Sequence, residues 1–282
     1  MTYSLVARDE DGTFGVVTAS RSLAVGATVP AVAPGAGALV TQAYTNTTFA
    51  ARGVDLLRRG LGAAEILDLL LRSDPEGSRR QVAVLGLDGE AAAWTGPDCT
   101  PPAGHLLGPG CVAAGNCLGG APVLGALRDT FMASTGTLAH RLALALTAGQ
   151  EAGGDGRGRQ SSALVVRGPG DDGGLRNAGR VDLRVDDHAD PVGELCRLLE
   201  LRHADVEGPD RATALRLTGD IAREVDTWLA ATGRGGGERL EKRLSDWARD
   251  ENLEHRLLHG RIDLTLLERL RSRGRSVRRS EG

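Results

Sequence analysis

The sequence predicts an α+β protein in which antiparallel sheets and pairs of helices are stacked in layers. The first fifty residues show strand patterns between turn signals. Two pairs of helical segments follow, and short strands separate and succeed them. The order strands, helices, strands, helices, strands places two helices in each helical layer around antiparallel sheets.

The first four predicted strands form two hairpins. Turn sequences rich in Gly, Asp and Pro at residues 9–12 and 34–37 connect the strands in pairs. The strands are residues 2–8, 14–19, 27–32 and 38–44. Because consecutive strands are joined by tight turns, we expect all four to form one antiparallel meander.

The remaining elements of the first two hundred residues continue this pattern. Helices are predicted at residues 49–59, 63–72, 122–134, 138–151 and 191–201. Strands are predicted at residues 81–87, 90–94, 111–114, 161–167 and 181–185. Residues 153–159, which are Gly, Arg and Asp, are expected to form a loop.

Chain length fits one medium domain with a smaller appendage. We predict a domain over residues 1–204, a helical linker over 205–237, and a small helical module over 238–282 with a disordered basic tail. Leu240, Leu244 and Trp247 share one face of a predicted helix in this module, and that face has to be buried against a partner. A packing or dimerisation role follows, so we expect a homo-oligomer.

The composition argues against several classes of function. A net charge of -3 provides no field for nucleic acid or an anionic membrane, and no apolar run is long enough to span a bilayer. The N-terminus has no secretory signal pattern, so we expect a cytoplasmic protein. The four cysteines lack metal-site spacing. We therefore expect neither a metal nor another cofactor.

The register of the first hairpin brings polar residues to one rim. If the turn is centred near Asp11, residues whose numbers sum to about 22 face each other, which places Thr2 opposite Ser20. The fourth strand of a meander returns to the same rim. The polar residues expected there are Thr2, Ser20, Arg21, Gln42, Tyr44, Thr45 and Asn46.

Thr2 is the candidate nucleophile of this rim. A threonine hydroxyl needs a base. Removal of Met1 would expose an α-amine, with an ordinary pKa near ~8, that can take the hydroxyl proton and later pass it to a leaving amine. Arg21 would lower the pKa of that amine and keep it neutral. The alternative is that Thr2 is simply the first residue of a strand.

Several motifs resemble one bacterial and archaeal family, the domain-of-unknown-function family 1028. They are TYSLVARD (2–9), ASRSLAVG (19–26), TQAYTN (41–46), GN (115–116), GGD (153–155), RGRQS (157–161) and VDLRVDDH (181–188). The resemblance covers about residues 2–202. It implies membership of the N-terminal-nucleophile hydrolase superfamily, with a four-layer αββα sandwich and Thr2 as nucleophile. Proteasome-type enzymes place a lysine near the nucleophile. Lys242 is the only lysine here, so Arg21 is the candidate electrostatic partner.

Other polar positions have candidate roles and structural alternatives. Asn116, at a strand end, could hold an oxyanion or could form a turn. Four residues of one loop could orient the Thr2 amine or bind a substrate carboxylate, or could form a structural Asp–Arg network. These are Asp155, Arg159, Gln160 and Ser161.

A second polar cluster allows a metal site, but solvent exposure or capping of the helix that begins at Pro191 is the preferred interpretation. The cluster comprises Asp182, Asp186, Asp187 and His188.

Together these features predict an amidohydrolase that cleaves the C–N bond of a small amide, ureido or imide compound through an acyl-enzyme on Thr2. The alternative is a degenerate hydrolase fold that serves as a binding or assembly module, which the missing lysine and the helical module motivate. That module resembles a peptidoglycan-binding-like appendage of the same family. Because the chain has no export signal, we do not expect it to bind peptidoglycan.

Overall fold

The computed structural model describes residues 2–171, 180–206 and 208–280, and the chain divides into two compact units, Met1–Leu199 and Glu200–Gly282. The first unit combines helices with two antiparallel sheets, which confirms the predicted α+β class. Among the described helices, none combines the length and the hydropathy needed to cross a membrane.

The larger sheet of the first unit has six strands in the order β10-β9-β2-β1-β8-β7. All neighbouring strands in it are antiparallel. In chain order the strands are β1 (Thr2–Arg8), β2 (Phe14–Ser20), β7 (Gly104–Gly108), β8 (Cys111–Asn116), β9 (Ser161–Arg167) and β10 (Arg180–Val185). The N-terminal strand β1 therefore lies in the middle of the sheet, between β2 and β8.

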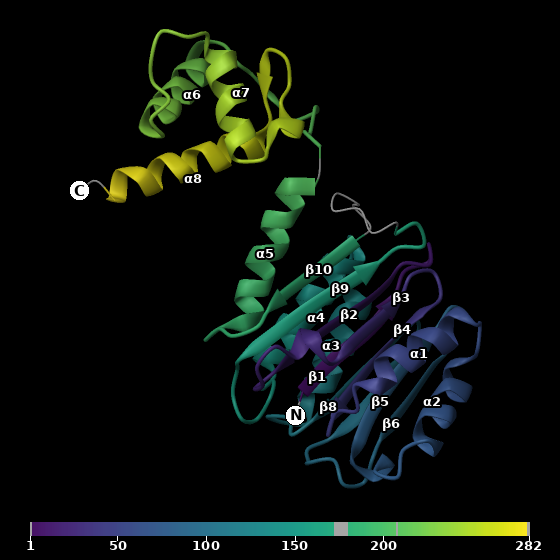
Figure 1. Cartoon of the computed structure of the whole chain (residues 1–282). Coiled ribbons are helices and arrows are strands. Elements are labelled where there is room, and N and C mark those ends of the chain that lie inside the picture. The colour runs from purple at the N-terminus through teal and green to yellow at the C-terminus, as the bar shows by residue number, and fades with distance from the viewer. Residues whose placement is uncertain (1, 172–179, 207, 281–282) are drawn as a thin grey trace. The chain divides into compact units, whose positions relative to one another are not determined.

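The smaller sheet has four strands in the order β3-β4-β5-β6. These are β3 (Pro30–Ala33), β4 (Gly37–Ala43), β5 (Arg80–Gly86) and β6 (Ala91–Thr95). The inner faces of the two sheets share one apolar core, to which Val6 and Val16 contribute from the larger sheet and Val40 and Leu85 from the smaller. The sheets are thus packed face to face (Figure 1).

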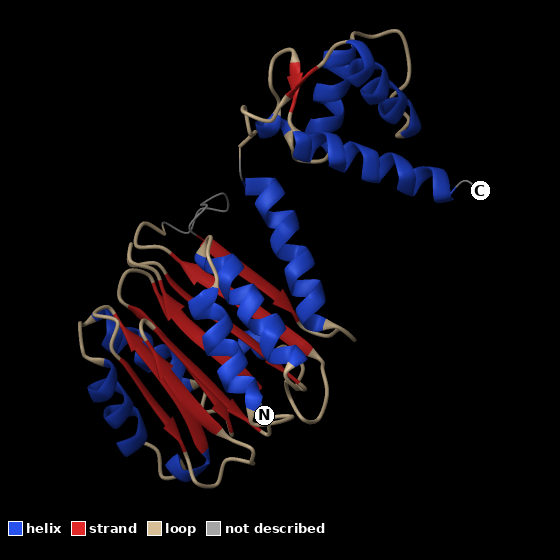
Figure 2. Ribbon diagram, turned by 180° about the vertical axis from the view of Figure 1, so that it is seen from behind, coloured by secondary structure: helices blue, strands red, loops and turns tan. Residues whose placement is uncertain are grey.

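Helices cover the outer face of each sheet. The four helices are α1 (Thr48–Arg58), α2 (Ala63–Arg72), α3 (Pro122–Ala133) and α4 (Leu138–Glu151). Phe49 and Ile66 of α1 and α2 pack on the smaller sheet. Leu127 and Leu142 of α3 and α4 pack on the larger sheet, and Figure 2 shows these two helices across it.

The alternation of side chains along β1 determines where Thr2 points. Tyr3 and Leu5 lie in the core shared with α3 and α4, whereas Val6 lies in the core between the sheets. Since successive side chains of a strand point to opposite faces, Thr2 and Ser4 share the inter-sheet face with Val6. The hydroxyl of Thr2 is therefore directed between the sheets.

The predicted register of the first hairpin is confirmed, because Thr2 pairs with Ser20. The predicted four-stranded meander is wrong: β2 pairs with β9, and β3 and β4 belong to the other sheet. The apolar inner faces of the two hairpins are buried against each other, so the hairpins stack instead of continuing one sheet. A short turn, η1 (Val25–Ala27), makes the crossing, and strand β7 was not predicted.

The second unit has a hydrophobic core of its own. After α5 (Pro191–Val206), which spans the boundary between the units, it contains β11 (Leu215–Arg216), α6 (Gly219–Ala231), α7 (Leu240–Asp250), η3 (Glu254–Arg256), β12 (Arg261–Ile262) and α8 (Leu264–Ser280). Val225 of α6, Trp247 of α7 and Leu267 of α8 share this core. Residues 205–237 therefore contribute a core helix, because α6 has an apolar face that α7 and α8 bury.

Candidate active site

Thr2 is the first described residue of β1 and is almost completely buried, with 4% of its surface exposed. It pairs with Ser20 of β2 on one side and with Asn116 of β8 on the other. The Thr2 hydroxyl donates a hydrogen bond to Ser20 Oγ at 3.2 Å. Three polar residues thus lie side by side at the ends of three neighbouring strands of the larger sheet, and we call this place the Thr2 edge.

A buried network of amides lies beneath this edge and joins the two sheets. Gln42 Nε2 donates to Gln81 Oε1 at 2.8 Å and to the Thr2 carbonyl at 3.4 Å. Asn116 Nδ2 donates to the same Gln81 Oε1 at 2.8 Å. Ser4 Oγ lies 2.7 Å from Gln42 Oε1 and 2.8 Å from Thr18 Oγ1. Because these five side chains are buried, each hydrogen bond restricts the positions of its neighbours.

The orientation of each amide in this network follows from its partners. Gln81 Nε2 can donate to the carbonyls of Gly104 and Gly115, at 2.9 and 2.8 Å, so its Oε1 must be the atom that faces Asn116. Asn116 therefore presents Nδ2 to Gln81, and its Oδ1 is buried with no hydrogen-bond partner among the described residues. An unpaired buried acceptor costs about 1–3 kcal/mol, and a donor on a bound ligand would remove that cost.

Ser4→Ala is expected to lower the free energy of unfolding by about 1–2 kcal/mol, because Gln42 Oε1 loses the hydroxyl beside it. Chemical denaturation followed by circular dichroism measures this. Ser134→Ala, which removes a hydroxyl that donates to the nearby Thr130 carbonyl, is the control. Equal effects of the two substitutions would contradict a special role for the buried network.

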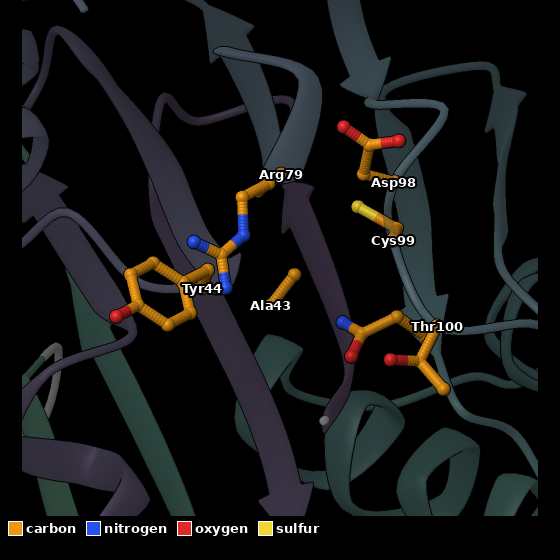
Figure 3. A pocket seen from close by; sticks show the side chains of 7 residues that line it. Ala43, Tyr44, Arg79, Asp98, Cys99 and Thr100 are labelled. Atoms are coloured by element: carbon orange, nitrogen blue, oxygen red, sulfur yellow. The ribbon is translucent and has the colours of Figure 1, made fainter. Parts of the chain in front are cut away.

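A cavity of about 230 Å³ adjoins this network (Figure 3). Its lining residues come from the end of β4, the η2 turn (Gly77–Arg79), the loop between β6 and β7, and the end of β8; they are Ala43, Tyr44, Arg79, Asp98, Cys99, Thr100 and Asn116. Two of these positions flank Thr2: Asn116 pairs with it, and Ala43 follows Gln42, which bonds its carbonyl. Thr2 is not itself one of the lining residues, but the cavity is lined by the residue that pairs with it.

Two residues at the border of the cavity have strained backbones. Ala43 has a φ of 69° and Cys117, directly after Asn116, has a φ of 48°. Residues with a side chain rarely adopt this left-handed conformation, which costs on the order of 1–3 kcal/mol. The Cys117 N–H donates to the Thr100 carbonyl at 2.7 Å, which helps to hold the turn in place. Strain of this kind is concentrated at functional sites in proteins.

A buried ion pair supports the loop that carries Tyr44. Arg80 Nε donates to Asp74 Oδ2 at 2.8 Å, with 7% and 5% of the two side chains exposed, and Arg80 Nη1 donates to the Tyr44 carbonyl at 2.5 Å. Asn46 Nδ2 also donates to Asp74 Oδ2. The hydrogen bond from Arg80 is the main cause that lowers the pKa of Asp74 to about 2. Asp74 is therefore an anion at neutral pH that anchors the loop.

Cys99 is a second potential nucleophile in the cavity, and its surroundings argue against that role. Burial raises the pKa of its thiol above the ordinary value. The thiol also donates to the Arg80 carbonyl, with Sγ 3.4 Å from the oxygen. Since the thiolate is the reactive form of cysteine, Cys99 is expected to be unreactive at neutral pH.

The residues predicted around Arg21 form a separate group at the other side of Thr2. Arg21 Nη1 donates to Gln160 Oε1 at 2.7 Å, and among the described residues no hydrogen bond or ion pair joins Arg21 to Thr2. Asp155 is buried and accepts from the Arg21 N–H at 2.9 Å and from Arg157. This matches the structural Asp–Arg network that was the alternative for this loop.

The two remaining predicted residues of this loop, Arg159 and Ser161, also have structural contacts. Ser161 Oγ accepts from the Val25 N–H and donates to the Ser22 carbonyl, so it holds the turn between the sheets. Arg159 Nη1 lies 3.4 Å from Asp190 Oδ1 at the surface.

The three residues predicted at the end of the fourth strand lie in different environments in the structure. Tyr44 lines the cavity beneath Arg79, whose guanidinium lies 3.8 Å from the centre of its ring. Asn46 caps the start of α1, because its Oδ1 accepts from the Thr48 N–H and hydroxyl. Thr45, between them, is partly buried.

Sequence reasoning missed Arg79, Gln81, Asp98 and the cavity itself. The polar Gln81 at the start of an apolar strand was an available signal, because a buried amide needs partners. Two of the acidic residues in the cluster at 182–188, for which a metal site was considered, have protein partners. Asp182 forms ion pairs with Arg167 and Arg184, and Asp187 accepts a hydrogen bond from Gln160. Within the described residues no group of three or more His, Cys, Asp or Glu side chains could hold a metal ion.

Comparison with known proteins identifies relatives of the first unit. Residues 2–195 match the model of a family of unknown function, DUF1028. The crystal structure of protein SPO2555 from Silicibacter pomeroyi, which carries the same family model, is similar with a TM-score of 0.65 and 31% sequence identity, over 78% of this chain and 88% of that one. A comparison with curated proteins finds no match.

Proposed function

The chain belongs to the DUF1028 family, and from that premise we propose that it is an amidohydrolase whose nucleophile is Thr2. The proposed substrate is a small amide, ureido or imide compound. We assign the packed helices and sheets of the first unit to the four-layer αββα sandwich of N-terminal-nucleophile hydrolases. Thr2 begins β1, a central strand of the larger sheet, and faces the space between the sheets.

One observation carries the proposal: the Thr2 hydroxyl donates to Ser20 and is directed between the sheets, and the residue paired with Thr2 on the next strand, Asn116, lines a cavity. A threonine that merely started a strand would not need the two buried polar neighbours Ser20 and Asn116, because burying each polar side chain costs desolvation energy. Met1 lies outside the described residues, so its removal is part of the proposal.

The reaction follows from the groups at this edge. The Thr2 α-amine takes the hydroxyl proton, Thr2 Oγ1 bonds to the substrate carbonyl carbon, and the C–N bond breaks as the proton passes to the leaving amine. Water then hydrolyses the ester on Thr2 and releases the acid. Ser20 orients the hydroxyl, because it is the partner of Thr2 Oγ1 in the resting site.

Asn116 has two groups to offer in this reaction. One Nδ2 hydrogen is bonded to Gln81, and the second is available to a tetrahedral oxyanion. In the proposed complex its Oδ1 accepts from the N–H of the substrate amide. Arg21 contributes a positive charge near the Thr2 amine, which favours the neutral form of that amine as a base.

We expect that the purified chain, expressed without added N-terminal residues, has lost Met1 and reacts with a β-lactone. Opening of the strained ring by Thr2 Oγ1 adds the whole mass of the lactone to the N-terminal peptide, with no leaving group. Intact mass and peptide mapping measure both results.

The matched control is the same chain with an N-terminal tag, in which Thr2 keeps its hydroxyl but has no free amine. This form is expected to remain unlabelled. Labelling of the tagged chain at an equal rate would exclude the α-amine as the base. An unlabelled native N-terminus would favour the alternative of a degenerate hydrolase that acts as a binding module.

A further inference from the structure

We propose that the cavity beside Thr2 selects small secondary amides that carry one carboxylate, with Arg79 binding the carboxylate and Asn116 Oδ1 accepting the amide N–H. The inference rests on the proposed function and names the substrate class of the same site. When the carboxylate is on the nitrogen side of the amide, as in N-acetylglycine, the leaving amine is an amino acid.

Asn116 Oδ1 supplies the first half of the recognition. It belongs to a residue that lines the cavity, it is buried, and it has no hydrogen-bond partner among the residues that the structure describes. Its amide cannot turn over to present Nδ2 instead, because Oδ1 would then face Gln81 Oε1, which is itself an acceptor. The wall of the cavity therefore contains a fixed acceptor that a hydrogen-bond donor on the ligand can satisfy. A secondary amide has such a donor, whereas a tertiary amide or an ester has none.

Arg79 is the group that would bind the carboxylate of the ligand. Its guanidinium stacks on Tyr44, which holds the planar group at the wall of the cavity (Figure 3). Its ion-pair partner is Glu76, at 3.2 Å, and both side chains are nearly half exposed. Such a pair is weak in water, and a guanidinium has five N–H donors. Arg79 can therefore bind a planar carboxylate through two parallel hydrogen bonds.

Asp98 and the cavity volume limit the class further. Asp98 is an exposed carboxylate of the same cavity, across from Arg79 (Figure 3). A second carboxylate on the ligand would be repelled there, so a monoanion is favoured over a dianion. The volume of about 230 Å³ lies below the ~300–1,000 Å³ of sites for drug-sized ligands. The ligand is thus of amino-acid size.

Binding to the Thr2→Ala chain tests the inference without turnover. Isothermal titration calorimetry is carried out with three probes: N-acetylglycine, its methyl ester and N-acetylsarcosine. The ester lacks the carboxylate, and the sarcosine compound lacks the N–H. Each is expected to bind at least about tenfold more weakly than N-acetylglycine, because one charged or buried hydrogen bond is lost.

Two variants of the Thr2→Ala chain assign the contacts. Arg79→Gln is expected to bind N-acetylglycine and its methyl ester equally well, but still to bind N-acetylglycine more tightly than N-acetylsarcosine. Asn116→Leu is expected to bind N-acetylglycine and N-acetylsarcosine equally well, but still to prefer the acid to its methyl ester. Arg72→Gln, on the exposed surface of α2, is the control and should leave both preferences unchanged. The probe comparison in the unchanged cavity remains valid even if Asn116→Leu fails to fold.

Equal affinity for the three probes, or no binding of N-acetylglycine below about 10 mM, would overturn the inference. Neither result bears on the lactone reaction of the native chain. The assignment of Thr2 as nucleophile would therefore be retained, and the proposed substrate class would be rejected. Conversely, the expected binding pattern with an unlabelled Thr2 would keep the ligand site and reject the hydrolase.

Discussion

Thr2→Ala is expected to abolish β-lactone labelling and to lower hydrolysis of N-acetylglycine by about 10⁴-fold or more, since a chain without its nucleophile retains only binding and oxyanion stabilisation. Alanine keeps a small second residue, so Met1 removal and the α-amine are preserved. Release of glycine and the mass of the N-terminal peptide measure the two effects.

Thr2→Ser is the matched control for that substitution. It keeps the hydroxyl, the amine and the partner Ser20, so labelling is expected to persist at the same residue. Thr2→Ala is also expected to change the free energy of unfolding by only about 1 kcal/mol, because one hydrogen bond is lost. Retention of turnover by folded Thr2→Ala would place the nucleophile elsewhere, and the loss of labelling in Thr2→Ser would show that the methyl group positions the hydroxyl.

The position of Thr2 could be predicted because it depends on local rules. A turn centred near Asp11 and the two-residue repeat of a strand are sufficient to place Ser20 opposite Thr2. The alternation along β1 then decides the face. No long-range information enters, and the helices and strands of the first unit, apart from β7, could be recognised from equally local patterns.

The rest of the site depends on contacts between distant segments. Gln81 receives hydrogen bonds from Gln42 and Asn116, residues of three different strands in two sheets. Their meeting follows from the face-to-face packing of those sheets, and the sequence pattern predicted a single meander instead. Arg21 shows the opposite error. The register correctly places Arg21 directly after Ser20, the partner of Thr2. Its side chain, however, bonds to Gln160, which lies on a loop whose path local patterns do not define.

Asp74→Asn is expected to lower the free energy of unfolding by about 2–3 kcal/mol at neutral pH. The carboxylate is buried and accepts from Arg80 and Asn46, and its pKa falls from 3.8 in the unfolded chain to about 2 in the folded one. A shift of this size corresponds to about 2 kcal/mol. The variant also leaves buried Arg80 with Glu76 as its remaining carboxylate, at 2.8 Å.

The sign of the pH dependence follows from the lowered pKa. The stabilising contribution of Asp74 is fully present above about pH 4 and is lost as the pH falls toward 2, where the folded chain takes up the proton as well. Urea denaturation between pH 2 and pH 7 should therefore show a steeper acid limb for the native chain than for Asp74→Asn. Asp68→Asn, which breaks an exposed pair with Arg72, should leave the profile unchanged. Parallel profiles for the native chain and Asp74→Asn would show that the Tyr44 loop is held by packing and by Arg80 alone, and the cavity wall would then not depend on the charge of Asp74.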